Sequence, residues 1–207
     1  MKKAIVYIRG KGGNAEESER YKQLFPKYEV IGFDYQSQTP WEAAKEFSSY
    51  FDSLLEQYSS IEIIANSIGA FFAMSALSGA QIEKAYFISP VADMEKLMID
   101  MMQWAGVNED DLEKTGSIKT AFGEILSFEY LSWVRRHPVA WTVPTSVLYG
   151  SKDNLQSIDT IMAFAEKCGA DVTIMENGEH WFHTEEQMAF LDEWICREHT
   201  ECMPTVM

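Results

Sequence analysis

Short apolar runs alternate along the chain with longer segments in which apolar residues recur at helical spacing. Most of the short runs lack a strict alternation of apolar and polar positions, which is typical of strands buried on both faces. Six runs are predicted to be strands: 4–8, 29–33, 61–65, 84–88, 145–149 and 171–175. Because helical patterns separate these runs, we predict a mostly parallel sheet of about six strands with helices on both faces, a three-layer α/β/α fold.

Polar residues and glycines mark the ends of the expected helices. Asn14, Thr39 and Thr184 are each followed three residues later by a glutamate or a glutamine, the capping-box pattern of a helix start. Gly79 and Gly169 follow helical segments, as glycines in left-handed C-caps do. These signals delimit the helices that are expected to cover the sheet.

The alternation lapses between Asp93 and Pro138. Three short helical patterns follow one another there without a strand, and Asp93, Asn108 and Ser127 are their expected caps. We interpret this segment, at about 92–140, as a helical lid inserted into a single domain that comprises residues 1–207. A chain of 207 residues fits one such domain, and two independent domains would be cramped.

The charge of the chain and the length of its apolar runs exclude several classes of partner. The formal net charge of −15 repels phosphate backbones, so we expect no nucleic acid partner and no strongly anionic substrate. The apolar run at residues 4–8 is too short for a signal peptide, and no run approaches the ~18 apolar residues of a membrane span. These features predict a cytoplasmic protein that acts on a small molecule.

Three cysteines, Cys168, Cys196 and Cys202, are too few and too irregularly spaced for a disulfide framework, which agrees with a reducing cytoplasm. Together with His199, the last two have the spacing of a metal clip, but no fourth ligand is evident. A solvated tail is the favoured interpretation of this segment. We predict neither a metal ion nor another cofactor.

The strongest chemical signal is an apolar strand that runs into Ala65-Asn66-Ser67-Ile68-Gly69 and then into a helix. Small residues at 65 and 69 allow the sharp strand-to-helix turn that exposes a serine hydroxyl. A chance small-x-Ser-x-Gly turn is the alternative interpretation. The segment resembles the nucleophile elbow of the α/β-hydrolases, and the resemblance implies that Ser67 is the nucleophile and that the Ile68 backbone N–H stabilises an oxyanion.

A glycine-rich turn after the first strand, Arg9-Gly10-Lys11-Gly12-Gly13, resembles the His-Gly-x-Gly loop of the same family. The resemblance implies that the Lys11 backbone N–H is the second oxyanion donor, although Arg9 stands where the family often has histidine. A phosphate-binding turn is the competing interpretation, but neither G-x-G-x-x-G nor the lysine motif of a P-loop occurs.

A serine nucleophile needs a base, because an unassisted hydroxyl is weakly nucleophilic near neutral pH. His180 follows the last predicted strand and precedes the final helix, where the family places its catalytic histidine. His183 directly precedes the Thr184 cap, and the positive end of a helix disfavours its protonation. His137 precedes a proline in the insertion and His199 lies in the tail, so His180 is the predicted base.

Asp153 follows the strand at 145–149 and a glycine turn, and this stretch resembles the acid loop of the family. The resemblance implies that Asp153 orients the imidazole and stabilises its charged form. Asp93 is an alternative acid, although it also fits a helix cap. The order Ser67, Asp153, His180 is the order of the family, and each residue lies just beyond a predicted strand. The chain departs from the fuller family pattern by lacking its first two strands.

The expected reaction is hydrolysis of a small, uncharged or apolar carboxylic ester through an acyl-enzyme intermediate. Met98 and Met102 on an apolar stripe of the insertion, together with Trp104 and Trp181, are candidate pocket residues, because thioethers and aromatic rings suit an apolar acyl group. Packing of the stripe onto the main body is the simpler interpretation. A thioesterase, amidase or acyltransferase would use the same triad, and a non-catalytic ligand-binding member of the fold is the alternative from another class.

Overall fold

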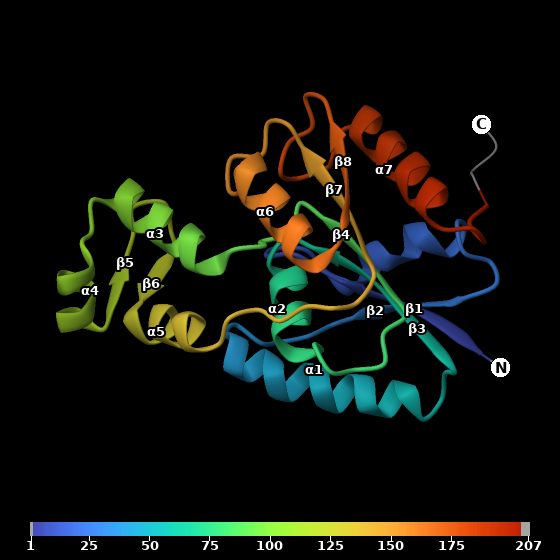
Figure 1. The fold of residues 1–207 in the computed structure, drawn as a ribbon, viewed down its shortest axis with the longest axis horizontal. Coiled ribbons are helices and arrows are strands. Elements are labelled where there is room, and N and C mark those ends of the chain that lie inside the picture. Colours follow the sequence, from blue (N-terminus) through green and yellow to red (C-terminus); the bar gives the residue numbers. More distant parts are fainter. Residues whose placement is uncertain (1, 204–207) are drawn as a thin grey trace. The chain divides into compact units, whose positions relative to one another are not determined.

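The computed structural model describes residues 2–203, and its sheet confirms the mostly parallel, six-stranded α/β architecture (Figure 1). The strands are β1 (Lys3–Ile8), β2 (Glu29–Phe33), β3 (Ser60–Asn66), β4 (Lys84–Ile88), β7 (Thr145–Gly150) and β8 (Asp171–Met175). They pair in parallel in the order β2-β1-β3-β4-β7-β8, so β1, β3, β4 and β7 are internal. All six predicted strands are confirmed, and each has bounds within one residue of the predicted run.

Helices cover both faces of this sheet (Figure 1). They are the 3₁₀ helix η1 (Ala15–Lys22) and the α-helices α1 (Pro40–Leu55), α2 (Ile68–Ala76), α6 (Ile158–Cys168) and α7 (Glu185–Glu198). Tyr86 of β4 meets Trp194 of α7 in a buried cluster that also includes Tyr21 of η1. The next residue, Phe87, points to the opposite face because side chains alternate along a strand, and it meets Phe164 of α6.

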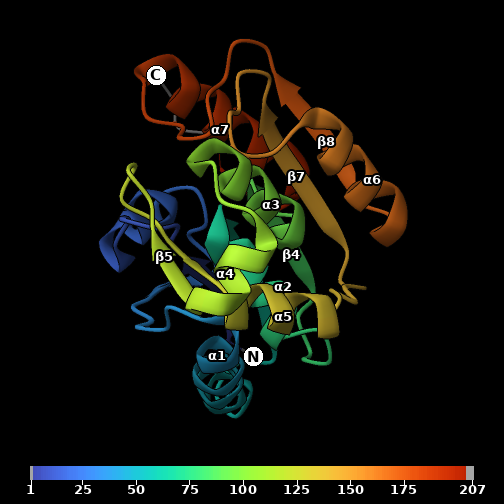
Figure 2. The same ribbon diagram turned by 90° about the vertical axis from the view of Figure 1, so that its left-hand side faces the viewer.

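Residues 93–139 form a compact unit of their own. This unit contains α3 (Met94–Ala105), α4 (Glu109–Thr115), β5 (Ser117–Lys119), β6 (Ile125–Ser127) and α5 (Phe128–Arg136). The predicted caps Asp93, Asn108 and Ser127 each accept a backbone N–H at the start of a helix. The prediction that this segment contains no strand is wrong, because β5 and β6 pair as an antiparallel hairpin, shown in yellow-green in Figure 2.

The other helix ends mostly follow the predicted signals. Thr39 and Thr184 are side-chain N-caps of α1 and α7, and Gly169 is the left-handed C-cap of α6 with a φ of 69°. The prediction for Gly79 is wrong, because α2 ends three residues earlier, at Ala76. Among residues 2–203, no helix is both long enough and apolar enough to cross a bilayer.

A buried polar cluster joins the residue that follows α7, His199, to the central strands. Glu62 of β3 accepts hydrogen bonds from the hydroxyl groups of Tyr28 and Tyr86, at 3.2 and 3.1 Å, and its Oε2 lies 3.3 Å from Nε2 of His199. Burial, reinforced by the charge of Glu62, raises the pKa of Tyr86, so its phenol stays protonated as a donor. His199 is 5% exposed, which corrects the prediction of a solvated tail.

A disulfide joins Cys196 of α7 to Cys202, whereas Cys168 is a free thiol. This pairing contradicts the expectation drawn from the number and spacing of the cysteines, so cysteine usage no longer argues for a reducing compartment. The disulfide also uses both sulfur atoms that the sequence suggested as metal ligands, those of Cys196 and Cys202. No cluster of three or more metal-binding side chains occurs within residues 2–203.

We expect reduction of the Cys196–Cys202 disulfide to lower the free energy of unfolding by roughly 2 kcal/mol, because the cross-link closes a short loop and restricts the unfolded chain. Urea unfolding of the wild type with and without a thiol reductant measures this effect. The double variant Cys196→Ser/Cys202→Ser should match the reduced wild type, and Cys168→Ser should keep the full response to reductant. An unfolding midpoint that the reductant leaves unchanged would contradict the pairing.

Helix α2 approaches β1 so closely that only glycine fits at position 69. A Cβ atom on Gly69 would lie 2.3 Å from the carbonyl oxygen of Arg9 and 2.9 Å from that of Ile8. Both oxygens belong to the backbone at the end of an internal strand, so they cannot turn aside as the tip of a flexible side chain could. Gly69 therefore sets the distance between the helix that begins after Ser67 and the strand that precedes the glycine-rich turn.

We expect Gly69→Ala to lower the free energy of unfolding by about 1–3 kcal/mol, the usual effect of overpacking a rigid site. Gly79→Ala is the matched control, because a Cβ atom there meets no atom within 4 Å, and it should stay within about 0.5 kcal/mol of wild type. Urea titration of both variants measures the difference. Equal stability of the two variants would argue against the close approach of α2 to β1.

Candidate active site

Backbone strain gathers at the carboxyl end of the sheet. Three non-glycine residues among residues 2–203 have a positive φ: Ser67 at 51°, Ser89 at 42° and Asn177 at 62°. They follow β3, β4 and β8, so each lies just beyond the carboxyl end of a parallel strand. Non-glycine residues keep such angles only where the surrounding structure holds them, and these positions cluster at functional sites.

Ser67 forms the turn between β3 and α2. Its N–H donates to the carbonyl oxygen of Ile88 at 3.0 Å, and its carbonyl oxygen accepts the N–H groups of Ala70 and Val91 at 3.2 and 3.1 Å. Ile88 ends β4 and Val91 follows it, so the strand on one side of β3 holds the strained turn. The close approach of Gly69 to β1 supports the turn from the other side.

His180 and Asp153 complete a continuous hydrogen-bonded chain with Ser67. The hydroxyl oxygen of Ser67 lies 2.8 Å from Nε2 of His180, and Nδ1 of His180 lies 2.7 Å from Oδ2 of Asp153. The side chain of His180 is 15% exposed and that of Asp153 is fully buried. Because an ionised carboxylate only accepts, Nδ1 carries the proton of the neutral ring, which leaves Nε2 as the acceptor for the serine hydroxyl.

Both oxygens of the buried Asp153 carboxylate have partners. In addition to the bond between Oδ2 and His180, Oδ1 accepts the backbone N–H groups of Leu155 and Gln156 at 2.8 and 3.1 Å. Three donors offset the cost of burying a charged group and hold the carboxylate in one orientation. The fixed carboxylate in turn fixes the plane of the imidazole.

The acid loop after β7 and the histidine loop after β8 are hydrogen-bonded to each other. The Lys152 N–H donates to the carbonyl oxygen of Gly178 at 2.8 Å, and the Ser151 N–H donates to that of Met175 at 3.0 Å. The Asn177 N–H donates back to the Ser151 hydroxyl at 2.8 Å. These hydrogen bonds hold the two loops together, which explains how the Asp153 carboxylate and the His180 imidazole keep a fixed distance.

The alternative acid and base have other partners. Asp93 caps α3 and accepts the Lys96 N–H at 2.9 Å. Nδ1 of His183 bonds to the carbonyl oxygen of Trp181 at 2.7 Å, and the two rings stack at a centroid distance of 4.6 Å. Each of these two side chains therefore has a local structural role.

The two predicted oxyanion donors lie at the ends of adjacent strands. Ile68 is the first residue of α2, and the N–H groups of a first helical turn have no acceptor within their own helix. Lys11 lies on the turn after β1, where Ile8 pairs in register with Ala65 of β3. The role of both N–H groups as oxyanion donors stays a prediction.

The predicted pocket residues are divided between the two compact units. Met98 and Met102 are buried on α3, and Trp104 of the same helix is 54% exposed. Trp181 belongs to the main unit, follows His180 directly and is 70% exposed. Trp181 thus directly follows the candidate base along the chain, and the assignment of all four residues to a pocket stays a prediction.

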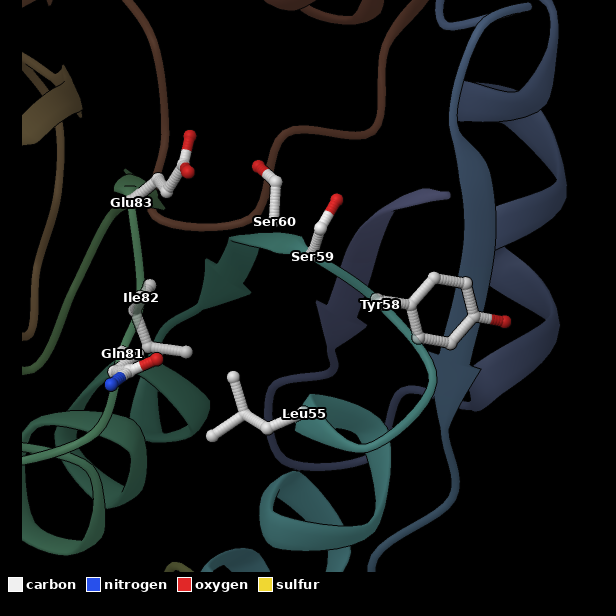
Figure 3. Close-up of a pocket in the computed structure, with 7 residues that line it drawn as sticks. All are labelled: Leu55, Tyr58, Ser59, Ser60, Gln81, Ile82 and Glu83. Carbon is white, nitrogen blue, oxygen red and sulfur yellow. The ribbon is translucent and has the colours of Figure 1, made fainter. Parts of the chain in front are cut away.

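A cavity of about 350 Å³ lies at the opposite end of the sheet (Figure 3). It is lined by Leu55, Tyr58, Ser59, Ser60, Gln81, Ile82 and Glu83. Ser60 is the first residue of β3 and Ser67 follows its last, so roughly 20 Å of strand separates the cavity from the candidate nucleophile. The cavity therefore does not belong to the Ser67 site.

Sequence reasoning missed the backbone groups that support this site. Leu155 and Gln156 act through N–H groups, which every residue except proline has, so their residue types carry no signal. The preference of aspartate for bonding to backbone two residues ahead is the one clue to this turn. Ser89 precedes a proline, which favours extended backbone and so points away from its observed positive φ.

No family model and no curated protein matches this sequence. Solved structures match its fold over nearly the whole chain. The mouse alpha/beta hydrolase domain-containing protein 10 has a TM-score of 0.72 at 17% identity, over 95% of this chain and 90% of that one. Est1E from Butyrivibrio proteoclasticus has a TM-score of 0.67 at 18% identity, over 94% and 88% of the two chains.

An esterase from Pyrococcus furiosus has a TM-score of 0.59 at 18% identity, over 95% of this chain and 80% of that one. Identities this low report the arrangement of the backbone and not the reaction. The parallel strand order and the strand-turn-helix at Ser67 agree with that arrangement. This chain therefore has the α/β-hydrolase fold.

Proposed function

We propose that this protein is a serine hydrolase that cleaves a small, uncharged or apolar carboxylic ester through an acyl-enzyme intermediate. The observation that carries the proposal is the hydrogen-bonded chain from the Ser67 hydroxyl through His180 to the buried Asp153. A hydroxyl, an imidazole and a carboxylate in this arrangement activate serine on several unrelated folds. The solved structures that share the fold support the general class, since those named above are hydrolases and esterases.

In the first half-reaction, the Ser67 oxygen forms a bond to the ester carbonyl carbon while Nε2 of His180 takes the hydroxyl proton. The negative charge moves to the carbonyl oxygen, which the N–H groups of Ile68 and Lys11 bind. The tetrahedral adduct then expels the alcohol, whose oxygen receives the proton from His180, and the acyl group stays on Ser67. Asp153 holds the ring and compensates its charge while it is protonated.

Water completes the reaction by the same transfers in reverse. His180 removes a proton from a water molecule as the water oxygen attacks the acyl carbon. The second tetrahedral adduct expels the Ser67 oxygen, which recovers its proton from His180, and the carboxylic acid leaves. Each turnover therefore restores both side chains and consumes one water molecule.

Other substrates and another class of function are alternatives to this proposal. Thioesters and amides pass through the same adducts, and an acyl acceptor other than water would make the protein an acyltransferase. The formal net charge of −15 favours neutral substrates, because it raises the cost of bringing an anion to the protein. A non-catalytic ligand-binding role would leave the serine unreactive, and this difference can be measured directly.

We expect a fluorophosphonate probe to label the wild-type protein once, at Ser67, because the reagent reacts with an activated serine and not with serine side chains in general. Ser67→Ala should abolish labelling, and Ser53→Ala, at an exposed position of α1, should leave it unchanged. Intact-protein mass spectrometry measures the added mass, and peptide mapping locates it. Labelling that persists in Ser67→Ala would reject the nucleophile, and an unlabelled wild type would favour the non-catalytic role.

Hydrolysis of p-nitrophenyl butyrate should separate the two candidate acids. Asp153→Asn should lower kcat on the order of 10³- to 10⁴-fold, because an amide no longer enforces the tautomer with its proton on Nδ1. Asp93→Asn should keep kcat within about twofold, since asparagine caps helices as well as aspartate does. Steady-state rates of both variants give the ranking, and the reverse ranking would assign the acid to Asp93.

A further inference from the structure

Arg9 holds the turn after β1 against the segment after β2. Its Nη2 donates to the carbonyl oxygen of Tyr35 at 2.8 Å, and its Nη1 donates to that of Gly10 at 3.2 Å. The Tyr35 hydroxyl donates back to the carbonyl oxygen of Arg9 at 2.9 Å. The guanidinium carbon lies 4.3 Å from the centre of the Tyr35 ring, within cation–π distance. These contacts, here named the Arg9 clasp, join two segments that are 26 residues apart.

Tyr35 is a rigid anchor for the Arg9 clasp. It is 1% exposed, and its ring packs against Phe47 of α1 and Phe72 of α2 at centroid distances of 5.2 and 5.9 Å. Burial raises the pKa of Tyr35 to about 12, so its hydroxyl remains protonated and donates at neutral pH. Because α2 begins directly after Ser67, Tyr35 packs against the helix that follows the candidate nucleophile.

The clasp fixes the orientation of one peptide group, the one that joins Gly10 to Lys11. The oxygen of this group accepts from Nη1 of Arg9 and also from the Gly13 N–H at 3.3 Å. A trans peptide group is planar, and its C=O and N–H bonds point in opposite directions. The two donors that hold the carbonyl oxygen therefore also set the direction in which the Lys11 N–H points.

The same turn passes close to the candidate nucleophile. A Cβ atom built on Gly10 would lie 3.2 Å from Cβ of Ser67 and 3.4 Å from the carbonyl oxygen of Asn66, so a side chain at this position would press on the serine turn. We infer that Arg9 is a positioning residue for the hydrolysis: by holding the Gly10 carbonyl oxygen, it aims the Lys11 N–H at the oxyanion. This inference rests on the proposed function, in which Lys11 supplies an oxyanion donor.

Arginine suits this role because its guanidinium is a planar fork whose N–H groups point in fixed, different directions. One branch reaches the Gly10 carbonyl oxygen while the other reaches that of Tyr35, so the turn and its anchor are held by a single rigid group. Lysine at position 9 would keep the positive charge and lose the fork. The two contributions can therefore be separated by substitution.

The variants Arg9→Met, Arg9→Lys and Tyr35→Phe test the inference in the full chain. Arg9→Met should lower kcat for p-nitrophenyl butyrate about 10- to 100-fold with KM within about twofold, a smaller loss than the ~10²- to 10³-fold loss that follows outright removal of an oxyanion donor. Arg9→Lys should recover only part of the loss. Tyr35→Phe removes one hydroxyl from the clasp, keeps the packed ring, and should lower kcat about 3- to 10-fold.

Arg20 provides a matched control on η1. Its guanidinium carbon also lies near a tyrosine ring, that of Tyr21 at 5.5 Å, and its Nη2 donates to the carbonyl oxygen of Met188 at 3.3 Å. Its Nη2 also forms an ion pair with Asp192 at 2.6 Å. Arg20→Met therefore removes at least as many contacts as Arg9→Met, in a different part of the molecule, and should keep kcat and KM. An effect that is common to both arginine variants would report general destabilisation and would overturn the role of Arg9.

A second measurement separates an effect on oxyanion binding from an effect on folding. Butylboronic acid forms a negatively charged tetrahedral adduct with an activated serine, so its Ki should rise in Arg9→Met by the same factor by which kcat falls. Loss of folded protein would lower the measured kcat and leave Ki unchanged. If Arg9→Met does not fold, the changes in kcat and Ki can be compared in Tyr35→Phe instead, because this variant differs from wild type by a single oxygen atom.

Besides an effect shared with Arg20→Met, three results would overturn the role of Arg9: unchanged kcat and Ki in Arg9→Met and Tyr35→Phe, a fall in kcat at constant Ki, or full recovery by Arg9→Lys. The last result would show that positive charge is sufficient and that the fork is not needed. A wild type that the fluorophosphonate leaves unlabelled would reject the proposed function and this inference together. If the probe labels Ser67 and the Arg9 variants keep the kcat and Ki of wild type, the inference alone would be rejected.

Discussion

The candidate site depends on a serine backbone that the sheet holds in a sterically unfavourable conformation. Ser67 has a φ of 51° and a ψ of −120°, and strain of this kind costs on the order of 1–3 kcal/mol. The residues at and after the end of β4 supply two of its backbone hydrogen bonds, while the contact between Gly69 and β1 keeps the following helix close. Because both neighbouring strands constrain the turn, the hydroxyl is directed at His180 before any substrate arrives.

Parallel strand pairing brings the other two residues of the hydrogen-bonded chain to the strained serine. All six strands of the main sheet run in the same direction, so the loops after β3, β7 and β8 reach one edge, and side chains 113 residues apart come within hydrogen-bond distance. The opposite half of the sheet has a different role. There Glu62 binds two phenols and His199, and these contacts attach the segment after α7 to the central strands. The candidate chemistry and the contacts of His199 therefore lie toward opposite ends of the strands.

The six strands and the three residues of the hydrogen-bonded chain could be predicted because each has a local signal, an apolar run followed by a turn. The β5–β6 hairpin could not, since strands of three residues are too short to show a period. The Cys196–Cys202 pair is recognisable only once the chain turns after α7 and brings the two Cα atoms to 4.9 Å. His199 is packed against three aromatic rings from two distant segments, and contacts of such long range leave no pattern in a single sequence.

The Arg9 clasp bears on the choice of substrate as well as on geometry. An arginine on a turn that passes close to a nucleophile would ordinarily suggest a site for an anionic substrate. Here its Nη groups donate to two backbone carbonyl oxygens and its face covers the Tyr35 ring, so its hydrogen bonds are directed at the protein itself. In the proposed mechanism, this arginine therefore does not bind a substrate anion, which agrees with a neutral ester as substrate. It would act on the transition state through the Lys11 N–H that its fork orients, and only interactions that strengthen in the transition state accelerate a reaction.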